Sequence, residues 1–148
     1  MKRIATAIWR GGPRAGEGVV STASGVFNNV IYTFGTTAID VPCTNPSEML
    51  AAAAASCTSM ILAKELEIEG IVSEHIATQA ELVITQDKEG WTISSIHLGV
   101  KVHMDPANEE VFQKAVQRAR QHCPITKSLK AKVTLEAAIE PVMAAVAD

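Results

Sequence analysis

The sequence predicts an α+β fold, in which strands and helices are grouped along the chain. Segments that alternate apolar and polar residues, as strands do, cluster before and after one long alanine-rich helical segment. Strands and helices do not alternate regularly, as they would in a βαβ protein. The expected order is βββ-α-ββ-αα-β, without internal repeats or a linker, so residues 1–148 are expected to form a single domain.

Three strands are expected in the amino-terminal part of the chain. Residues 4–9 alternate in character and form the first candidate, and GGPRAGEG (residues 11–18) is a loop by composition. Residues 19–24 and 30–34 are expected to pair as a hairpin, joined through the glycine- and asparagine-containing segment between them.

The long helix carries clear start and stop signals. Asn45 is a good N-cap, Pro46 suits the first helical position, and Glu48 lies where a capping-box partner is expected. The helix should run to about Glu69 and stop at the glycine that follows. Residues 49–63 are apolar nearly all round, so this helix is expected to be buried on most sides.

The carboxyl-terminal half is expected to contain three more strands and two helical segments. In chain order these are strand 75–86, turn 87–90, strand 91–103, helix 107–122, helical turn 125–129 and strand 133–139. Proline cannot continue a helix, so Cys123-Pro124 should separate the two helical segments.

Composition and charge exclude several classes of protein. The chain has 148 residues, 47% of them hydrophobic and 20% charged, which argues against disorder. A net charge of −3 without a basic cluster makes nucleic acid and membrane poor partners. No signal peptide and no membrane-spanning window is expected, so the cytoplasm is the expected location. Three cysteines do not make a disulfide framework, and unpaired thiols are expected.

The three cysteines lie in different surroundings. Cys57 ends the run AAAAASC, where a thiol is either a small buried hydrophobe or a nucleophile in a narrow pocket. Cys123 precedes a proline at a helix break, where free N–H groups and the helix dipole favour a thiolate; an ordinary cysteine at a turn is the alternative. Cys43, in the expected loop VPCTN, is expected to have no role.

The four histidines do not predict a metal centre. His97 and His103 could share one face of a strand, and His122 adjoins Cys123. None of the four forms a short-range metal signature with a cysteine. We therefore expect neither a metal ion nor another cofactor.

Two cysteine segments resemble a known family. TNPSEMLAAAAASC (44–57) and HCPITKSL (122–129) are similar to the two signature segments of the OsmC/Ohr family of thiol peroxidases, and their separation also fits. IWRGGPRAGEGVVSTASG (8–25) resembles the amino-terminal hairpin of the OsmC branch, so the resemblance covers nearly the whole chain. It implies an intertwined homodimer, with two sheets around a long buried central helix and two active sites at the subunit interface.

The resemblance also implies a reaction. Cys57 would be the peroxidatic and Cys123 the resolving cysteine in the reduction of organic hydroperoxides, and an external dithiol of the lipoyl or another type would restore them. Two alternatives stay open from the residues themselves. One is a family member that binds a small hydrophobic ligand, and the other is a redox sensor that forms the 57–123 disulfide without rapid recycling.

The sequence departs from the family pattern at the ion pair that supports the thiolate. Ser47 stands at the position of the family's glutamate, and Thr37 at the position of the OsmC-branch arginine. Glu48 lies about half a turn around the helix from Cys57, which favours a capping role over a catalytic one. Arg14, or else Arg10, is the candidate replacement for the missing cation; a solvated loop arginine is the alternative for both.

Overall fold

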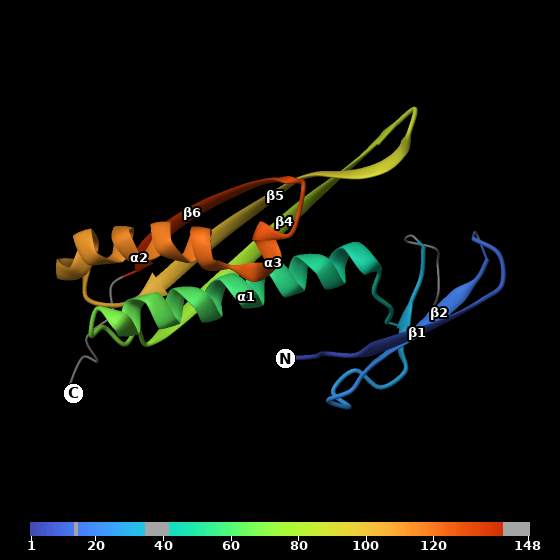
Figure 1. Ribbon diagram of the computed structural model, residues 1–148, viewed down its shortest axis with the longest axis horizontal. Helices are drawn as coiled ribbons and strands as arrows, with labels where there is room; N and C mark the ends of the chain where they lie inside the picture. The colour runs from blue at the N-terminus through green and yellow to red at the C-terminus, as the bar shows by residue number, and fades with distance from the viewer. Residues whose placement is uncertain (14, 35–41, 141–148) are drawn as a thin grey trace, which may run out of the picture. The chain divides into compact units, whose positions relative to one another are not determined.

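The computed structural model describes residues 1–13, 15–34 and 42–140 (Figure 1). The chain forms two compact units, Met1–Leu50 and Ala51–Asp148. Each unit has one three-stranded sheet within its described residues, and a long helix connects the two sheets in sequence. The predicted α+β class with two sheets is thus confirmed.

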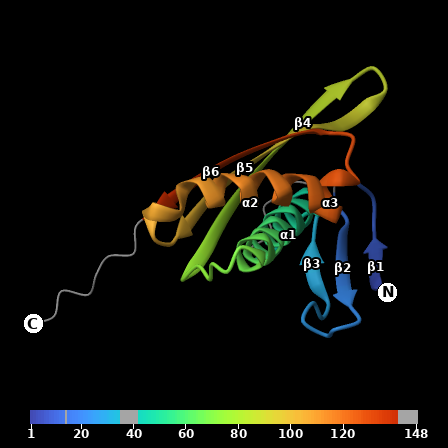
Figure 2. The ribbon, with the colours of Figure 1, turned by 60° about the vertical axis from the view of Figure 1, so that its left-hand side comes forward.

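The first sheet is antiparallel and has the strand order β1-β2-β3 (Figure 2). Its strands are β1 (Ala5–Arg10), β2 (Glu17–Thr22) and β3 (Val30–Tyr32), which confirms the predicted hairpin although β2 starts two residues early. Gly18 pairs with Tyr32, and a Cβ at Gly18 would lie 2.4 Å from the tyrosine ring. The close approach of this ring explains the glycine in the middle of a strand.

The long helix, α1 (Pro46–Ile68), begins and ends as predicted. The backbone N–H of Glu48 donates to Asn45 Oδ1 at 2.9 Å, which confirms Asn45 as the N-cap. Gly70 has a φ of +77°, and the N–H of Ile71 donates to Leu66 O at 3.0 Å. A residue with positive φ and a hydrogen bond of this kind close the last turn of a helix.

One stripe of α1 is exposed in the single chain. The prediction that this helix is buried on most sides is therefore wrong for the isolated chain. Met60 is 64% exposed. The exposed side chains between residues 51 and 63 follow helical spacing: Ala52, Ser56, Met60 and Ala63. A sheet covers one side of a helix, and the opposite stripe stays open unless another element packs on it.

The length and composition of α1 also correct an expectation about membranes. This helix is long and apolar enough to cross a membrane, although no window of that kind was expected. Its buried positions carry core residues of the second sheet unit, namely Ala54, Leu62 and Leu66. The core helix of a globular unit meets the same criterion of length and hydropathy.

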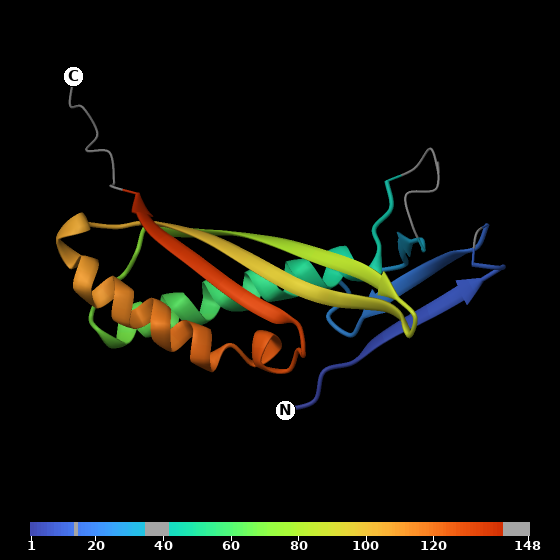
Figure 3. The same cartoon turned by 90° about the horizontal axis from the view of Figure 1, so that it is seen from above.

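The second sheet has the order β4-β5-β6 and carries α1 and α2 along one face (Figure 3). β4 (His75–Asp87) and β5 (Gly90–His103) are antiparallel, whereas β6 (Lys132–Glu140) runs parallel to β5. The crossover between β5 and β6 contains the 3₁₀ turn η1 (Pro106–Asn108), α2 (Glu109–His122) and α3 (Pro124–Lys127). The first turn of the predicted helix 107–122 is therefore a 3₁₀ turn.

The core of this unit lies between the sheet and the helices. Phe112 of α2 and Leu62 and Leu66 of α1 are at most 1% exposed, and they pack together with Val100 and Val102 of β5. A second cluster joins Ala54, Ile96 and Leu98 to residues near α3, Ile125 and Leu129. These two clusters fix α1, α2 and α3 against one sheet; Cys57 lies on α1, and Cys123 lies between α2 and α3.

Candidate active site

Cys57 and Cys123 are brought together by the fold. They are 66 residues apart in sequence, yet their sulfur atoms lie 3.0 Å apart. Both are free thiols, and Cys57 is 8% exposed whereas Cys123 is 1% exposed. A disulfide has an S–S length of about 2.05 Å, so a movement of about 1 Å would close the bond.

The backbone around each cysteine explains this contact. Cys57 lies one turn after Ala54, a fully buried alanine whose small side chain allows close packing. Cys123 ends α2 through its N–H, which donates to Ala119 O at 3.1 Å, and it caps α3 through its carbonyl, which accepts from Lys127 N at 3.1 Å. Its extended backbone, with φ −67° and ψ 110°, places it at the joint of two helices.

The two thiols differ in acidity. Burial raises the pKa of the Cys123 thiol, but hydrogen bonds from the hydroxyl and amide of Thr126, from Cys57 and from the amide of Ile125 outweigh it. The pKa of Cys123 therefore lies below its ordinary value, as its position before Pro124 predicted. Burial raises the pKa of Cys57, and the hydrogen bond with Cys123 raises it further, although the Ile125 amide acts in the opposite direction.

The proton between the two sulfur atoms follows this difference. In the neutral pair Cys123 Sγ donates to Cys57 Sγ. Because the pKa of Cys123 is lowered and that of Cys57 is raised, loss of one proton from the pair favours the thiolate on Cys123, with the Cys57 thiol as its hydrogen-bond donor. Among the described residues, no basic side chain lowers the pKa of Cys57.

An ionic cluster forms around the buried Glu65 and includes His122, the residue before Cys123; the sequence reasoning missed it. The side chain of Glu65 is 3% exposed; it accepts from Arg118 Nε at 2.9 Å and from His122 Nδ1 at 2.9 Å. A second nitrogen of Arg118 reaches Glu69 at 2.6 Å. Glu65 follows Lys64 in the charged last part of α1, so its position gave no signal of burial; the histidine directly before Cys123 was the available signal.

The remaining predicted site residues lie in the amino-terminal unit or outside the described part of the chain. Glu48 Oε2 accepts from Thr44 Oγ1 at 2.9 Å, so its carboxylate is engaged at the start of α1, in keeping with a capping role. The predicted capping box thus runs through Thr44, not through the amide of Asn45. Arg10 ends β1 and is exposed. Arg14 lies outside the described residues, as does Thr37.

Cys43 is separate from the buried thiols. It is exposed, and its sulfur lies 3.9 Å from Thr33 Oγ1, at the limit of a sulfur hydrogen bond. An exposed thiol of this kind is accessible to alkylating reagents, which makes Cys43 a useful internal control for reactions of the buried pair.

One cluster in the described part of the chain has donor atoms close enough for a metal ion. Glu74, His75 and His103 each offer a ligand atom, and these atoms lie within 4.8 Å of one another. The cluster also has partners within the protein, since the two imidazoles stack with centroids 3.9 Å apart and His103 Nε2 lies 2.7 Å from Glu140. These contacts account for its geometry without an ion.

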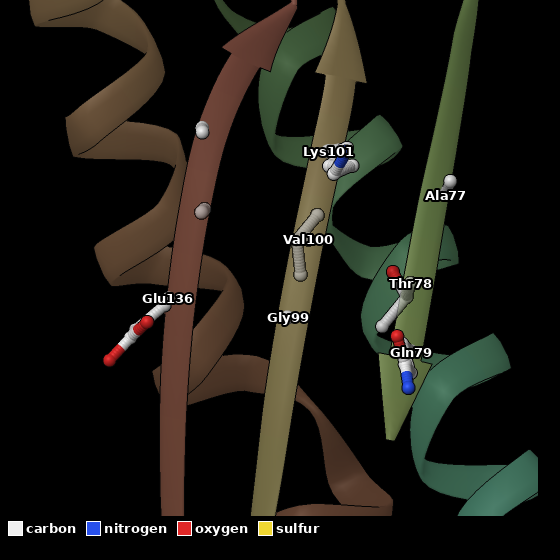
Figure 4. A pocket seen from close by; sticks show the side chains of 9 residues that line it. Ala77, Thr78, Gln79, Gly99, Val100, Lys101 and Glu136 are labelled. Atoms are coloured by element: carbon white, nitrogen blue, oxygen red, sulfur yellow. The ribbon is translucent and has the colours of Figure 1, made fainter. Parts of the chain in front are cut away.

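A hollow of about 520 Å³ lies on the second sheet (Figure 4). Ala77, Gly99 and Ala138, one from each strand, are among the residues that line it, and Lys101 and Glu136 add charges. Neither buried cysteine belongs to the lining. The hollow is therefore distinct from the thiol pair.

The fold and the buried thiol pair define a dithiol protein of the α+β class. The sequence matches the family model for OsmC-like proteins over residues 39–138. It is 35% identical to peroxiredoxin OsmC of Escherichia coli over 128 residues, which cover 86% of this chain and 90% of that protein. The chain therefore belongs to the OsmC-like family, which confirms the resemblance seen in the two cysteine segments.

Solved structures share this fold. An OsmC-like protein of unknown function from Vibrio cholerae superposes with a TM-score of 0.75 at 16% identity, covering 93% of this chain and 99% of that one. The organic hydroperoxide resistance protein OhrB of Bacillus subtilis gives a TM-score of 0.68 at 23% identity, covering 93% of this chain and 98% of that one. At these identities the similarity shows the fold alone.

Proposed function

We propose that this protein is a peroxiredoxin-type enzyme that reduces organic hydroperoxides through Cys57 and Cys123. The observation that carries the proposal is the 3.0 Å contact between two free, buried sulfur atoms. The identity to peroxiredoxin OsmC over most of the chain supports the peroxidase class. We expect a cytoplasmic homodimer that uses an external dithiol, of the lipoyl or another type, as its reductant.

In the first step Cys57 attacks the peroxide. The Cys123 thiolate accepts the proton of Cys57 across the 3.0 Å contact, and the Cys57 thiolate attacks the distal oxygen of the hydroperoxide. The O–O bond breaks, Cys57 becomes a sulfenic acid, and the alkoxide takes the proton from Cys123 and leaves as an alcohol. Cys123 thereby returns to the thiolate.

In the second step Cys123 resolves the sulfenic acid. Its thiolate attacks the Cys57 sulfur, the S–O bond breaks, and hydroxide leaves and takes a proton from solvent to form water. The product is a Cys57–Cys123 disulfide, and the peroxide has accepted two electrons. An external dithiol reduces the disulfide by exchange and restores both thiols.

The exposure of the two cysteine residues supports this division of roles. Cys57 is 8% exposed and Cys123 is 1% exposed, so the substrate reaches Cys57 more easily. The lower pKa of Cys123 favours the thiolate on the residue that serves first as a base and then as the resolving nucleophile.

A cation near Cys57 would assist the attack, because burial raises the pKa of this thiol. We propose Arg14 for this role. Arg14→Ala should slow peroxide consumption by about ten- to a thousandfold, the effect of losing one electrostatic donor, with little change in stability. Arg10→Ala is the matched comparison, and a loss in that variant with Arg14→Ala unchanged would transfer the role to Arg10.

Peroxide consumption and mass mapping test the proposal together. After treatment with cumene hydroperoxide, the 57–123 disulfide should form while Cys43 stays open to alkylation. In Cys123→Ser a sulfenic acid should be trapped by dimedone on Cys57. Peroxide consumption no faster than that by free cysteine would overturn the proposal and favour ligand binding. If dimedone labels Cys123 in Cys57→Ser but does not label Cys57 in Cys123→Ser, the two cysteines exchange their roles.

A further inference from the structure

Glu65 is the one charged side chain among the buried residues of the described chain. It lies on α1, two turns after Cys57, and the thiol chemistry above does not use it. Burying a carboxylate costs free energy unless it is paired and hydrogen-bonded. Unlike its exposed neighbours Lys64 and Glu67, Glu65 is buried, and its partners explain how the carboxylate is accommodated.

Both partners of Glu65 come from the last turns of α2. Arg118 Nε contacts Oε2 and His122 Nδ1 contacts Oε1, each at 2.9 Å, so each carboxylate oxygen has its own donor. The two donors lie four residues apart, one turn of the helix. One carboxylate on α1 thus holds the end of α2 at two points.

The end of α2 carries Cys123. His122 is the residue directly before it, so an anchor on the imidazole fixes the backbone next to the sulfur. Cys123 itself has an extended backbone between α2 and α3 and leaves the helix at this point. A contact of 3.0 Å between sulfur atoms requires that this joint stay in place.

We propose that Glu65 and His122 are positioning residues, which hold the end of α2 against α1 and keep the sulfur of Cys123 in contact with that of Cys57. The consequence for turnover rests on the function proposed above, because the resolving step needs this contact. The geometric claim concerns only the reactivity of the two thiols toward each other.

The anchor holds in both protonation states of the histidine. In the neutral tautomer with its proton on Nδ1, His122 donates to Glu65 through that nitrogen. In the cation Nδ1 also carries a proton and donates in the same way. The His122 side chain is 53% exposed, so the rest of the ring reaches solvent. Removing the imidazole therefore leaves no large cavity, and a variant at this position should fold.

The test measures how readily the two thiols form a disulfide in glutathione buffers. Oxidised glutathione takes up two electrons from the thiol pair and yields the protein disulfide and two reduced glutathiones, so no peroxide is involved. The equilibrium constant of this exchange gives the effective concentration of one thiol toward the other. In a Cys43→Ser background, His122→Ala should lower this effective concentration by about ten- to a hundredfold, the scale of a hydrogen bond to a charged group. Glu65→Gln, which keeps the size but not the charge, should lower it in the same direction.

Two further variants separate positioning from general stability. His122→Asn should recover most of the loss, because its amide N–H can take the place of Nδ1–H. Glu69→Gln removes the other carboxylate of Arg118 but does not touch His122, so its effective concentration should stay within about twofold of the parent. Melting temperatures of all variants are measured in parallel.

An unchanged effective concentration in His122→Ala would overturn the proposal. So would an equal loss in Glu69→Gln, or a loss that follows the melting temperature across the series. If the glutathione equilibrium shifts as expected while wild-type protein consumes no peroxide, the positioning role stands and the peroxidase function fails. The two ideas can therefore fail separately.

Discussion

Ser59 Oγ lies 2.7 Å from Thr78 Oγ1, and this hydrogen bond joins α1 to β4 two residues after Cys57. Ser59 also donates to Ala55 O at 3.2 Å, so Thr78 is the donor between the two hydroxyls. The bond ties the helix that carries Cys57 to the sheet.

Thr78→Val should therefore lower the free energy of unfolding by about 1 kcal/mol, the net value of one such hydrogen bond. Urea denaturation measures the change. Ser56→Ala is the control, since the Ser56 hydroxyl bonds only within its own helix, to Ala52 O at 2.8 Å and to Ala53 O at 3.2 Å. A larger loss in Ser56→Ala than in Thr78→Val would contradict this role of the bond.

Thr58→Val should stabilise the protein. The Thr58 side chain is 1% exposed, and its hydroxyl has no hydrogen-bond partner among the described residues. Replacing a buried, unpaired hydroxyl by a methyl group of the same shape should raise the free energy of unfolding by about 1 kcal/mol. Thr58→Ala, which also loses a methyl group, should be less stable than Thr58→Val in the same urea titration.

The stability of the second unit should fall in acid through Glu65. The hydrogen bond from His122 holds the pKa of Glu65 below its ordinary value, and Arg118 adds to this effect while burial opposes it. Because the folded-state pKa is the lower one, this contribution is present above the unfolded value and is lost as pH falls through the folded value. Melting temperatures below about pH 5 should drop less steeply in Glu65→Gln than in wild type; parallel profiles would refute this.

Alkylation kinetics should show the acidity of Cys123. In a Cys43→Ser background, the reaction of Cys123 with iodoacetamide should reach half of its maximal rate at a pH below the ordinary thiol value. Thr126→Val should move this midpoint upward, because it removes the hydroxyl that stabilises the thiolate. A midpoint that does not move would exclude Thr126 as a cause.

The exposed stripe of α1 should be covered in solution by a second copy of the chain. Sedimentation at micromolar concentration should give about twice 15.7 kDa. Met60 is 64% exposed in the single chain, and a charge there would be buried in such an interface. Met60→Glu should therefore shift the protein toward the monomer, and a variant that stays dimeric would place the interface elsewhere.

Local signals predicted most of the elements. Asn45 and Gly70 mark the ends of the long helix, and Cys123-Pro124 marks the break between two helices, because capping and proline geometry depend on neighbouring residues alone. The direction of β6 was not predicted, since a parallel pairing depends on how the crossover packs.

The site was only partly predictable from the residues. The meeting of Cys57 with Cys123 followed from the family resemblance, since no local pattern joins positions 66 residues apart. The partners of Glu65 depend on the packing of α2 against α1, and they became visible only in the structure. The burial of α1 was overestimated, because composition does not tell how much of a helix its own chain covers.

The parallel pairing of β6 with β5 has a consequence for the order in which the protein is made. The crossover that contains Cys123 is closed only when β6 has paired with β5. This pairing begins with Ser95 opposite Lys132 and ends with His103 opposite Glu140. A nascent chain that ends before Lys132 already carries all three cysteines but lacks the strand that closes the crossover. We therefore expect Cys57 and Cys123 to meet late in synthesis, after the last strand has emerged, and the growing chain to expose separate thiols until that moment.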